Sequence, residues 1–227
     1  MAGARRGKRY LTGIASSAED ISLGDRPLLI CDIDEVALEF VTPFMAFLIS
    51  RGHELRPVSF RLTGNIFPLE GDRAVEQAQV SALLEEFFAE QDRWQHAAEA
   101  AVETLHDLSA IADIVFLTAM PPRHRAIRRR VLDTLAMPYP MIASEQPKGP
   151  AALAIHGERD QPVAFVDDIF RNLHSVRDHL PQALLVNLMA HEGFRALAPD
   201  PGDGVVTAQG WPEAGRLIRR HFSSADD

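Results

Sequence analysis

Short apolar runs alternate along the chain with longer stretches in which apolar residues recur every three or four positions. The short runs predict buried strands at 28–33, 113–117, 140–143, 163–166, 182–189 and 204–208. The periodic stretches predict helices at 121–137, 148–157, 169–180 and 211–222. Strands that alternate with helices pair in parallel, because right-handed crossovers place the helices on both faces of one sheet. The pattern therefore predicts an α/β fold with a Rossmann-like parallel sheet as its core.

One long stretch, 41–106, interrupts this alternation. It begins with an apolar segment and continues through a Gly- and Pro-rich connection over 51–72, which we expect to be irregular. Helical periodicity then extends to about residue 112. We expect 41–106 to form a small helical cap beside an α/β core made of 27–40 and 107–222.

Charge and composition narrow the classes of partner. The formal net charge of −9 argues against long stretches of nucleic acid but leaves a small anionic substrate possible. Cys31 is the single cysteine, which excludes an intramolecular disulfide and a multi-cysteine zinc site, and we expect it to be a small core residue.

Targeting signals are weak in this sequence. No apolar run approaches the roughly 18 residues needed to span a bilayer, so no membrane partner is expected. The basic stretch at the start of the chain lacks the apolar segment of a secretion signal, which favours a cytoplasmic location. We expect 1–26 to be a partly disordered tail and 223–227 a second tail.

Polar side chains with useful chemistry follow four of the predicted strands. They are Asp32 and Asp34 after the first strand, Thr118 after the second, Lys148 beyond the third, and Asp167 and Asp168 after the fourth. Asp32 and Asp34 are two residues apart, so in an extended chain their carboxylates project from the same face. Ligands of open α/β sheets bind outside the carboxyl ends of the strands. That edge of the sheet is therefore the expected functional site.

If these strands adjoin, four carboxylates meet one ammonium group, and burying them without compensation would be strongly unfavourable. A hard divalent cation with oxygen ligands would resolve the repulsion, and Mg²⁺ is the usual choice where phosphate is also bound. One carboxylic acid that stays protonated would relieve the rest. An aspartate can attack phosphorus, and a second carboxyl group can act as acid and base. The residues therefore favour Mg²⁺-dependent phosphoryl transfer.

Four segments resemble, in order, the four motifs of the haloacid dehalogenase superfamily of hydrolases: DIDEV at 32–36, FLT at 116–118, Lys148, and FVDD at 165–168. The resemblance spans residue 27 to about residue 190. It implies a phosphatase that acts on a small phosphomonoester metabolite, since the dehalogenases of this superfamily lack the second acid, Asp34. The insertion between the first two motifs implies a mobile helical cap that closes over the substrate. The stretch VALEFVTPFMAFLISRG is also faintly similar to nucleotidase-like members.

The resemblance also implies a role for each motif residue. Asp32 would be the nucleophile and Asp34 the general acid and base. The phosphoryl group would be bound by Thr118, Ala119 and Lys148. The Mg²⁺ ligands would be Asp32, the backbone carbonyl of Asp34, and Asp168, with Asp167 assisting.

Glu35 departs from the family pattern, because many relatives carry glycine directly after the second aspartate. Its bulk and charge are expected to affect cap movement or metal entry. The alternative function is therefore a degenerate family member that binds a phosphorylated ligand or partner without turnover, although every catalytic position is filled. A phospho-accepting receiver domain is excluded, because its acidic pair comes first and its accepting aspartate stands alone on a middle strand.

Several other side chains have less specific predictions. Three arginines at helical spacing predict a solvated helix face that can pair with acidic residues: Arg125, Arg128 and Arg129. Three aromatic residues are expected to form the small core of the cap: Phe87, Phe88 and Trp94. The candidates for contact between the cap and a substrate are Trp94, Arg61 and Asn65.

Overall fold

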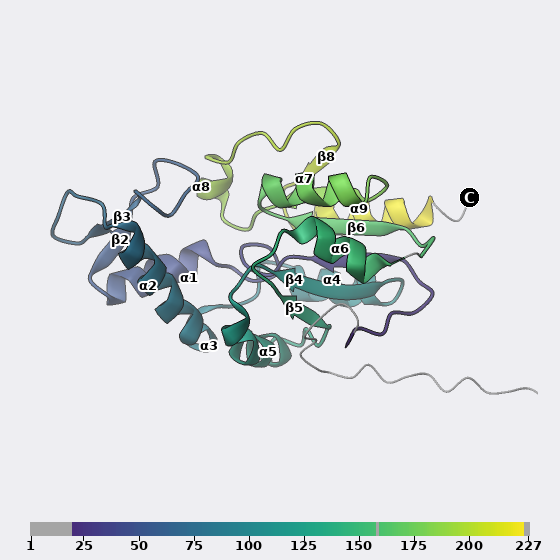
Figure 1. Ribbon diagram of the computed structural model, residues 1–227, viewed down its shortest axis with the longest axis horizontal. Coiled ribbons are helices and arrows are strands. Elements are labelled where there is room, and N and C mark those ends of the chain that lie inside the picture. The colour runs from purple at the N-terminus through teal and green to yellow at the C-terminus, as the bar shows by residue number, and fades with distance from the viewer. Residues whose placement is uncertain (1–19, 158, 225–227) are drawn as a thin grey trace, which may run out of the picture.

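The computed structural model describes residues 20–157 and 159–224. Most of the expected N-terminal tail, residues 1–19, lies outside the described residues. The centre of the fold is a six-stranded sheet in the order β5–β4–β1–β6–β7–β8, in which all neighbouring strands are parallel (Figure 1). The strands are β1 (Leu28–Cys31), β4 (Asp113–Thr118), β5 (Met141–Ala143), β6 (Val163–Asp167), β7 (Leu184–Leu188) and β8 (Val205–Ala208). The predicted α/β fold is confirmed.

The strand order reverses at β1, and this reversal locates the ligand site. From β1 the chain passes to β4 and β5 on one side, then returns to β6, β7 and β8 on the other. In open parallel sheets a crevice forms at the carboxyl ends of the strands where the order reverses. The residues that follow β1, β4 and β6 therefore meet at one place.

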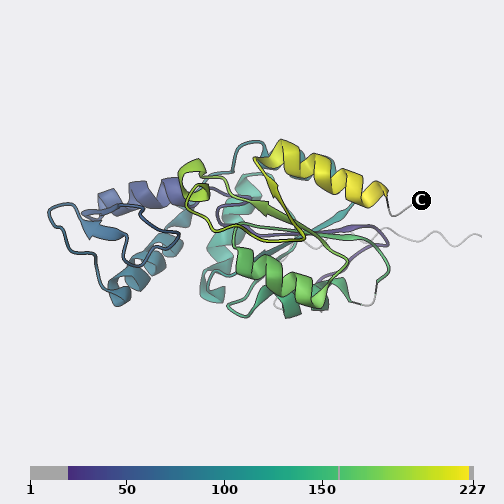
Figure 2. The same cartoon turned by 90° about the horizontal axis from the view of Figure 1, so that it is seen from above.

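Helices cover both faces of the sheet, because alternate strand residues point to opposite sides. Leu29 and Cys31 of β1 belong to the cluster beneath α4 and α9, whereas Leu28 and Ile30 belong to the cluster beneath α6 and α7. The predicted burial of Cys31 is confirmed. Figure 2 shows the yellow α9 on one side of the sheet and the green helices on the other. The core helices are α4 (Ala101–Ser109), η2 (Pro122–His124), α5 (Arg125–Thr134), α6 (Lys148–His156), α7 (Phe170–His179), α8 (Glu192–Arg195) and α9 (Trp211–Ser223).

The cap lies at one end of the sheet, between β1 and β4 in the chain (Figure 1). It consists of α1 (Val41–Ser50), β2 (His53–Leu55), β3 (Ile66–Pro68), α2 (Gln77–Ala89) and α3 (Gln91–Trp94). The expectation of an irregular connection over 51–72 is wrong in part, because β2 and β3 pair as a short antiparallel hairpin. The expected cap boundary at residue 106 falls inside α4, and the buried face of this helix, with Leu105 and Leu108, packs under the sheet.

Aromatic rings fill the interior of the cap. Phe87 is fully buried, and its ring centroid lies 5.2 Å from that of Phe44 and 5.5 Å from that of Phe47. Phe88 and Trp94 are partly buried against the same cluster, so the predicted small core of the cap is confirmed. None of the helices in the described part of the chain is both long and apolar enough to cross a membrane.

Candidate functional site

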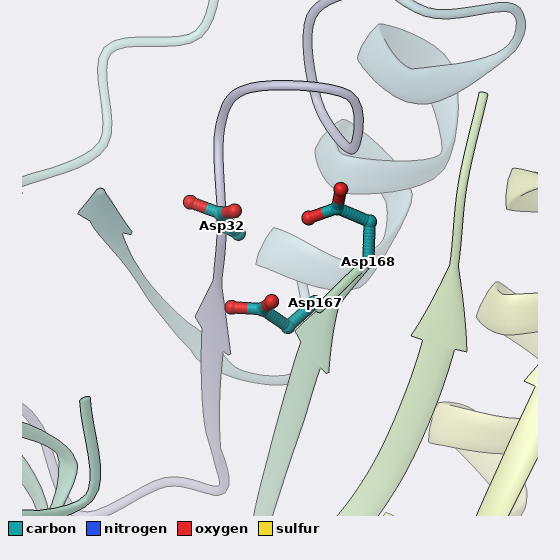
Figure 3. A group of neighbouring side chains, drawn as sticks. All are labelled: Asp32, Asp167 and Asp168. Atoms are coloured by element: carbon teal, nitrogen blue, oxygen red, sulfur yellow. The ribbon is translucent and has the colours of Figure 1, made fainter. Parts of the chain in front are cut away.

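Three carboxylates meet at the carboxyl ends of β1 and β6. Figure 3 shows Asp32 just after β1, Asp167 at the end of β6, and Asp168 directly after it. One oxygen of each lies within 4.8 Å of one oxygen of the others. Their exposed fractions are only 6%, 0% and 9%. Water therefore screens little of their mutual repulsion, and the site must compensate these charges locally.

Lys148 provides part of that compensation. Its Nζ lies 2.7 Å from Oδ1 of Asp32 and donates a hydrogen bond of 2.6 Å to Oδ2 of Asp167. Lys148 is the first residue of α6, where a positive charge interacts unfavourably with the helix dipole. The helix itself therefore gains nothing from a lysine at this position. The next residue, Gly149, allows close packing, since a Cβ there would collide with the carbonyl oxygen of Ser175 in α7. The packing of α6 on α7 therefore fixes the ammonium between the two aspartates.

Asp167 is already saturated by partners from its own chain. Besides Lys148, it accepts hydrogen bonds from the backbone N–H of Ile169 at 2.8 Å and from Nδ2 of Asn172 at 3.0 and 3.2 Å. Asp168 differs, because its carboxylate has no hydrogen-bond or ion-pair partner among residues 20–157 and 159–224. Oδ1 of Asp32 is also buried without a hydrogen bond, so its contact with Lys148 is an ion pair that is poorly aligned for one. Among the described residues, the oxygens of this cluster without a protein partner are therefore Oδ2 of Asp32 and both carboxylate oxygens of Asp168.

The electrostatics of the cluster follow from its burial. Burial raises the pKa of Asp32 to about 7, since desolvation outweighs the attraction of Lys148 and the charges of Asp167 and Asp34 add to it. Burial and the neighbouring charges of Asp167 and Asp32 raise the pKa of Asp168 well above its ordinary value. Burial acts to lower the pKa of Lys148, but the two adjoining carboxylates outweigh it and raise this pKa. One lysine is too little positive charge for this cluster.

Thr118 and Ala119 lie at the end of β4. Thr118 is buried, and its hydroxyl accepts a hydrogen bond of 3.1 Å from the backbone N–H of Met120. The same hydroxyl lies 3.4 Å from Oδ2 of Asp34. Ala119, between Thr118 and Met120, is exposed on the loop that follows β4. The residues predicted from the strand ends are thus brought to one edge of the sheet.

Asp34 forms an ion pair with Arg128, an arginine for which the sequence predicted a solvated position. Arg128 of α5 donates to Oδ2 of Asp34 at 3.0 Å and to Oδ1 at 2.8 Å. The expectation of a solvated face is wrong for Arg128 and Arg129, which are 0% and 8% exposed, while Arg125 is exposed as expected. Arg128 lies three and four residues before the buried Val131 and Leu132, so its place on the apolar stripe was the available signal.

Two glutamines of the cap join this ion pair. Gln95 donates to Oδ1 of Asp34 at 2.9 Å and accepts from Arg128 at 3.0 Å. Gln91 of α3, which is fully buried, accepts from Nε of Arg128. The guanidinium group therefore links α5, the loop after β1, and the last helix of the cap.

Glu35 adopts a left-handed backbone conformation with φ of 65°, which glycine tolerates better than glutamate. Its buried carboxylate accepts hydrogen bonds from the backbone N–H groups of Phe40 at 3.1 Å and Val41 at 2.7 Å, and from that of His191. These donors belong to the start of α1 and to the loop after β7. Burial raises the pKa of Glu35, although these hydrogen bonds counteract the shift. Glu35 thus caps the first cap helix, whose own N-cap residue, Phe40, provides no side-chain acceptor.

Glu35→Ala is expected to lower the free energy of unfolding by about 2 kcal/mol, because three buried backbone donors lose their acceptor. Glu35→Gly is expected to cost about 1 kcal/mol less than the alanine variant, since glycine relieves the left-handed backbone. Urea unfolding of both variants measures the difference. A glycine variant less stable than the alanine variant would contradict this account of the backbone.

Comparisons with solved structures place this architecture among known folds. The structure matches a haloacid dehalogenase-like hydrolase from Streptococcus pneumoniae with a TM-score of 0.54, 12% identity, and coverage of 87% of this chain and 99% of that chain. It matches a candidate β-phosphoglucomutase from Thermotoga maritima with a TM-score of 0.56, 15% identity, and coverage of 86% and 99%. It matches a haloacid dehalogenase-like hydrolase from Xanthomonas campestris with a TM-score of 0.54, 13% identity, and coverage of 89% and 94%.

Comparisons of the sequence itself gave no match, either to models of protein families or to curated proteins. The likeness to solved structures extends over the core and the cap, since it covers most of both chains. The chain therefore has the fold of the haloacid dehalogenase-like hydrolases, with a small cap inserted between the first and second strands of the core sheet.

Proposed function

We propose that the protein is a Mg²⁺-dependent phosphatase that hydrolyses a small phosphomonoester. The observation that carries the proposal is the convergence of Asp32, Asp168 and Lys148 at the end of β1, where free carboxylate oxygens adjoin one fixed ammonium group. Such a site combines a nucleophile, a cation site and an anion-binding lysine. Thr118 and the exposed Ala119 adjoin it at the end of β4 and would bind the phosphoryl oxygens.

The carboxylate cluster fits a magnesium ion. All of its donors are hard oxygen atoms, and burial together with the neighbouring carboxylates raises the pKa values of Asp32 and Asp168, so a bound cation would relieve the cluster. Asp32, Asp168 and the backbone carbonyl of Asp34 would hold the ion, while Asp167 mainly positions Lys148. Bound Mg²⁺ would supply charge neutralisation for the nucleophile and the phosphate.

In the first step, a carboxylate oxygen of Asp32 forms a bond to phosphorus and the ester oxygen departs. Asp34 gives its proton to that leaving oxygen. In the second step, Asp34 takes a proton from water, the water oxygen bonds to phosphorus, and the bond between phosphorus and Asp32 breaks to release inorganic phosphate. Arg128 donates to both carboxylate oxygens of Asp34, Gln95 donates to Oδ1, and Oδ2 also lies 3.4 Å from the hydroxyl of Thr118.

Phosphate release from a panel of phosphomonoesters tests the proposal. Purified protein is expected to release inorganic phosphate with MgCl₂ and to lose this activity in EDTA. Readdition of Mg²⁺ should restore it. The proposal fails if no member of the panel is hydrolysed, or if EDTA leaves the rate unchanged.

Mg²⁺ is also expected to stabilise the fold, and more strongly at about pH 8 than at about pH 5. Without metal, folded Asp32 retains its proton up to about pH 7, so the stability contributed by this proton is present at low pH and lost as the pH rises through that value. A metal that binds the carboxylates replaces the proton, and at ~100-fold excess over its Kd it should raise the melting temperature by about 5 °C.

Thermal unfolding with and without MgCl₂ at both pH values measures this effect. Asp168→Asn removes a free ligand and should abolish the shift, whereas the exposed Asp160→Asn should keep it. An equal shift at both pH values would contradict the competition between proton and metal.

A further inference from the structure

A cavity of about 230 Å³ lies between the cap and the core, directly beside the carboxylate cluster. We call it the cap–core pocket. Asp168 and Glu35 line it from the core, and the loop between β2 and β3 lines it from the cap with Phe60, Arg61 and Leu62. Because Asp168 also belongs to the carboxylate cluster, the pocket adjoins the place where a phosphoryl group would bind.

The walls of the pocket are mainly apolar. Phe40 and Phe60 contribute aromatic surface from the cap side, and Phe194 of α8 faces them, with its ring centroid 6.3 Å from that of Phe60. The carboxylate of Glu35 is already engaged by three backbone N–H groups, so it offers little to a ligand. A sugar or polyol in this pocket would lose hydrogen bonds to water without replacement, which costs free energy. The walls therefore favour an apolar, flat group.

The volume limits the size of that group. Pockets for drug-sized ligands typically enclose ~300–1,000 Å³, so this one suits a smaller molecule. The volume therefore favours a ligand part about the size of one substituted six-membered ring.

Arg61 is the one cationic side chain among the residues that line the pocket. In the described part of the chain its guanidinium group forms no ion pair or side-chain hydrogen bond, although the chain is acidic as a whole. Its backbone is held in place by Asn65, which is 1% exposed and donates to the carbonyl oxygens of Arg61 at 2.7 Å and Ser59 at 2.9 Å. A fixed loop with an unpaired guanidinium at an apolar pocket is suited to an anionic group on a ligand.

We propose that the cap–core pocket binds the organic part of the substrate, and that this part is a single aromatic ring with a carboxylate that pairs with Arg61. This proposal rests on the proposed phosphatase function and specifies its substrate class. Of the two cap-loop candidates from the sequence, Arg61 is then the residue that sets specificity, while Asn65 shapes the loop that presents it.

Three substrates with the same benzylic leaving oxygen test the proposal: 4-carboxybenzyl phosphate, 4-carbamoylbenzyl phosphate and benzyl phosphate. The carboxylate compound is expected to have a KM about tenfold lower than the other two, which corresponds to one partly buried ion pair. Glycerol phosphate, which has a polar organic part, is expected to be the poorest substrate by kcat/KM. No preference for the carboxylate compound would overturn the assignment.

Arg61→Met should raise the KM for 4-carboxybenzyl phosphate about tenfold, with little change in kcat and no change for benzyl phosphate. The matched control is Arg73→Met, since Arg73 is also an exposed cap arginine but pairs with Glu76 and does not line the pocket. Equal effects of Arg61→Met on all three substrates, or none on any, would contradict the proposal.

A binding measurement separates this proposal from the phosphatase function itself. Calorimetry with 4-carboxybenzylphosphonate, which cannot be hydrolysed, should give tighter binding than benzylphosphonate, and Arg61→Met should remove the difference. If the protein binds in this way but releases no phosphate, the pocket assignment stands and the phosphatase function fails. If it hydrolyses all the esters without discrimination, the reverse holds.

Discussion

Asp32→Asn is expected to reduce the rate of phosphate release by about 10⁴-fold or more, as removal of a nucleophile does in other covalent enzymes. The amide has nearly the same shape as the carboxylate but cannot form the aspartyl phosphate. Lys148 keeps its hydrogen bond of 2.6 Å to Asp167, so the variant should retain its fold. It should even be more stable near neutral pH, because burial raises the pKa of Asp32 and the charged form is disfavoured there.

Phosphate release in MgCl₂, together with the urea midpoint of each protein, measures both effects. Asp160→Asn makes the same chemical change at an exposed position and should keep full activity. An Asp32→Asn variant that retains activity within about tenfold of the wild type would exclude Asp32 as the nucleophile.

The core of the candidate site could be predicted from the sequence because it depends on strand ends. Apolar runs that stop at Asp32, Thr118 and Asp167 give the strands and their carboxyl ends, and parallel pairing then brings those ends together. Lys148 was included because it follows the third of these strands, and the resemblance implied its role. The structure brings its ammonium to within 2.7 Å of Asp32 because α6 packs closely on α7, a tertiary fact that local sequence does not contain.

The connections of the cap were harder to predict. The strands β2 and β3 are only three residues each and lie among glycine and proline residues, so their apolar period is too short to recognise. The helix α4 has the same apolar periodicity as a cap helix. Only its packing against the sheet shows that it belongs to the core and not to the cap. The sequence thus predicted the helix α4 but not its packing partners, and it predicted neither β2 nor β3.

Glu35 and Arg128 show a second limit. The left-handed conformation of Glu35 was signalled only by the glycine of the family pattern, and its function as an acceptor for α1 depends on a loop that is distant in sequence, at His191. Charge patterning assigned Arg128 to solvent, since arginines are rarely buried without a partner. Its partner, Asp34, lies 94 residues away in the chain. Buried ion pairs between distant segments are therefore the features that local pattern reasoning misses.

Arg128→Met is expected to lower kcat about 100-fold and the free energy of unfolding by about 3 kcal/mol, because it breaks a buried ion pair and leaves Gln91 and Gln95 without a donor. Arg128→Lys restores the charge but not the two parallel hydrogen bonds to Asp34, so it should recover stability more than kcat. The control is Arg130→Met, which lies on the same helix with an exposed side chain and should change neither quantity. Steady-state kinetics and urea unfolding measure the two effects separately.

A double-mutant cycle with Asp34→Asn determines whether Arg128 acts through Asp34. If Arg128 positions this carboxylate for proton transfer, its replacement should cost little further activity once Asp34 is an asparagine, because the two residues then act as one unit. Losses in kcat that simply multiply would mean that Arg128 supports the site by packing alone. An Arg128→Met protein with reduced stability but normal kcat would lead to the same conclusion, and the contact between the cap glutamines and the acid group would then have only a structural function.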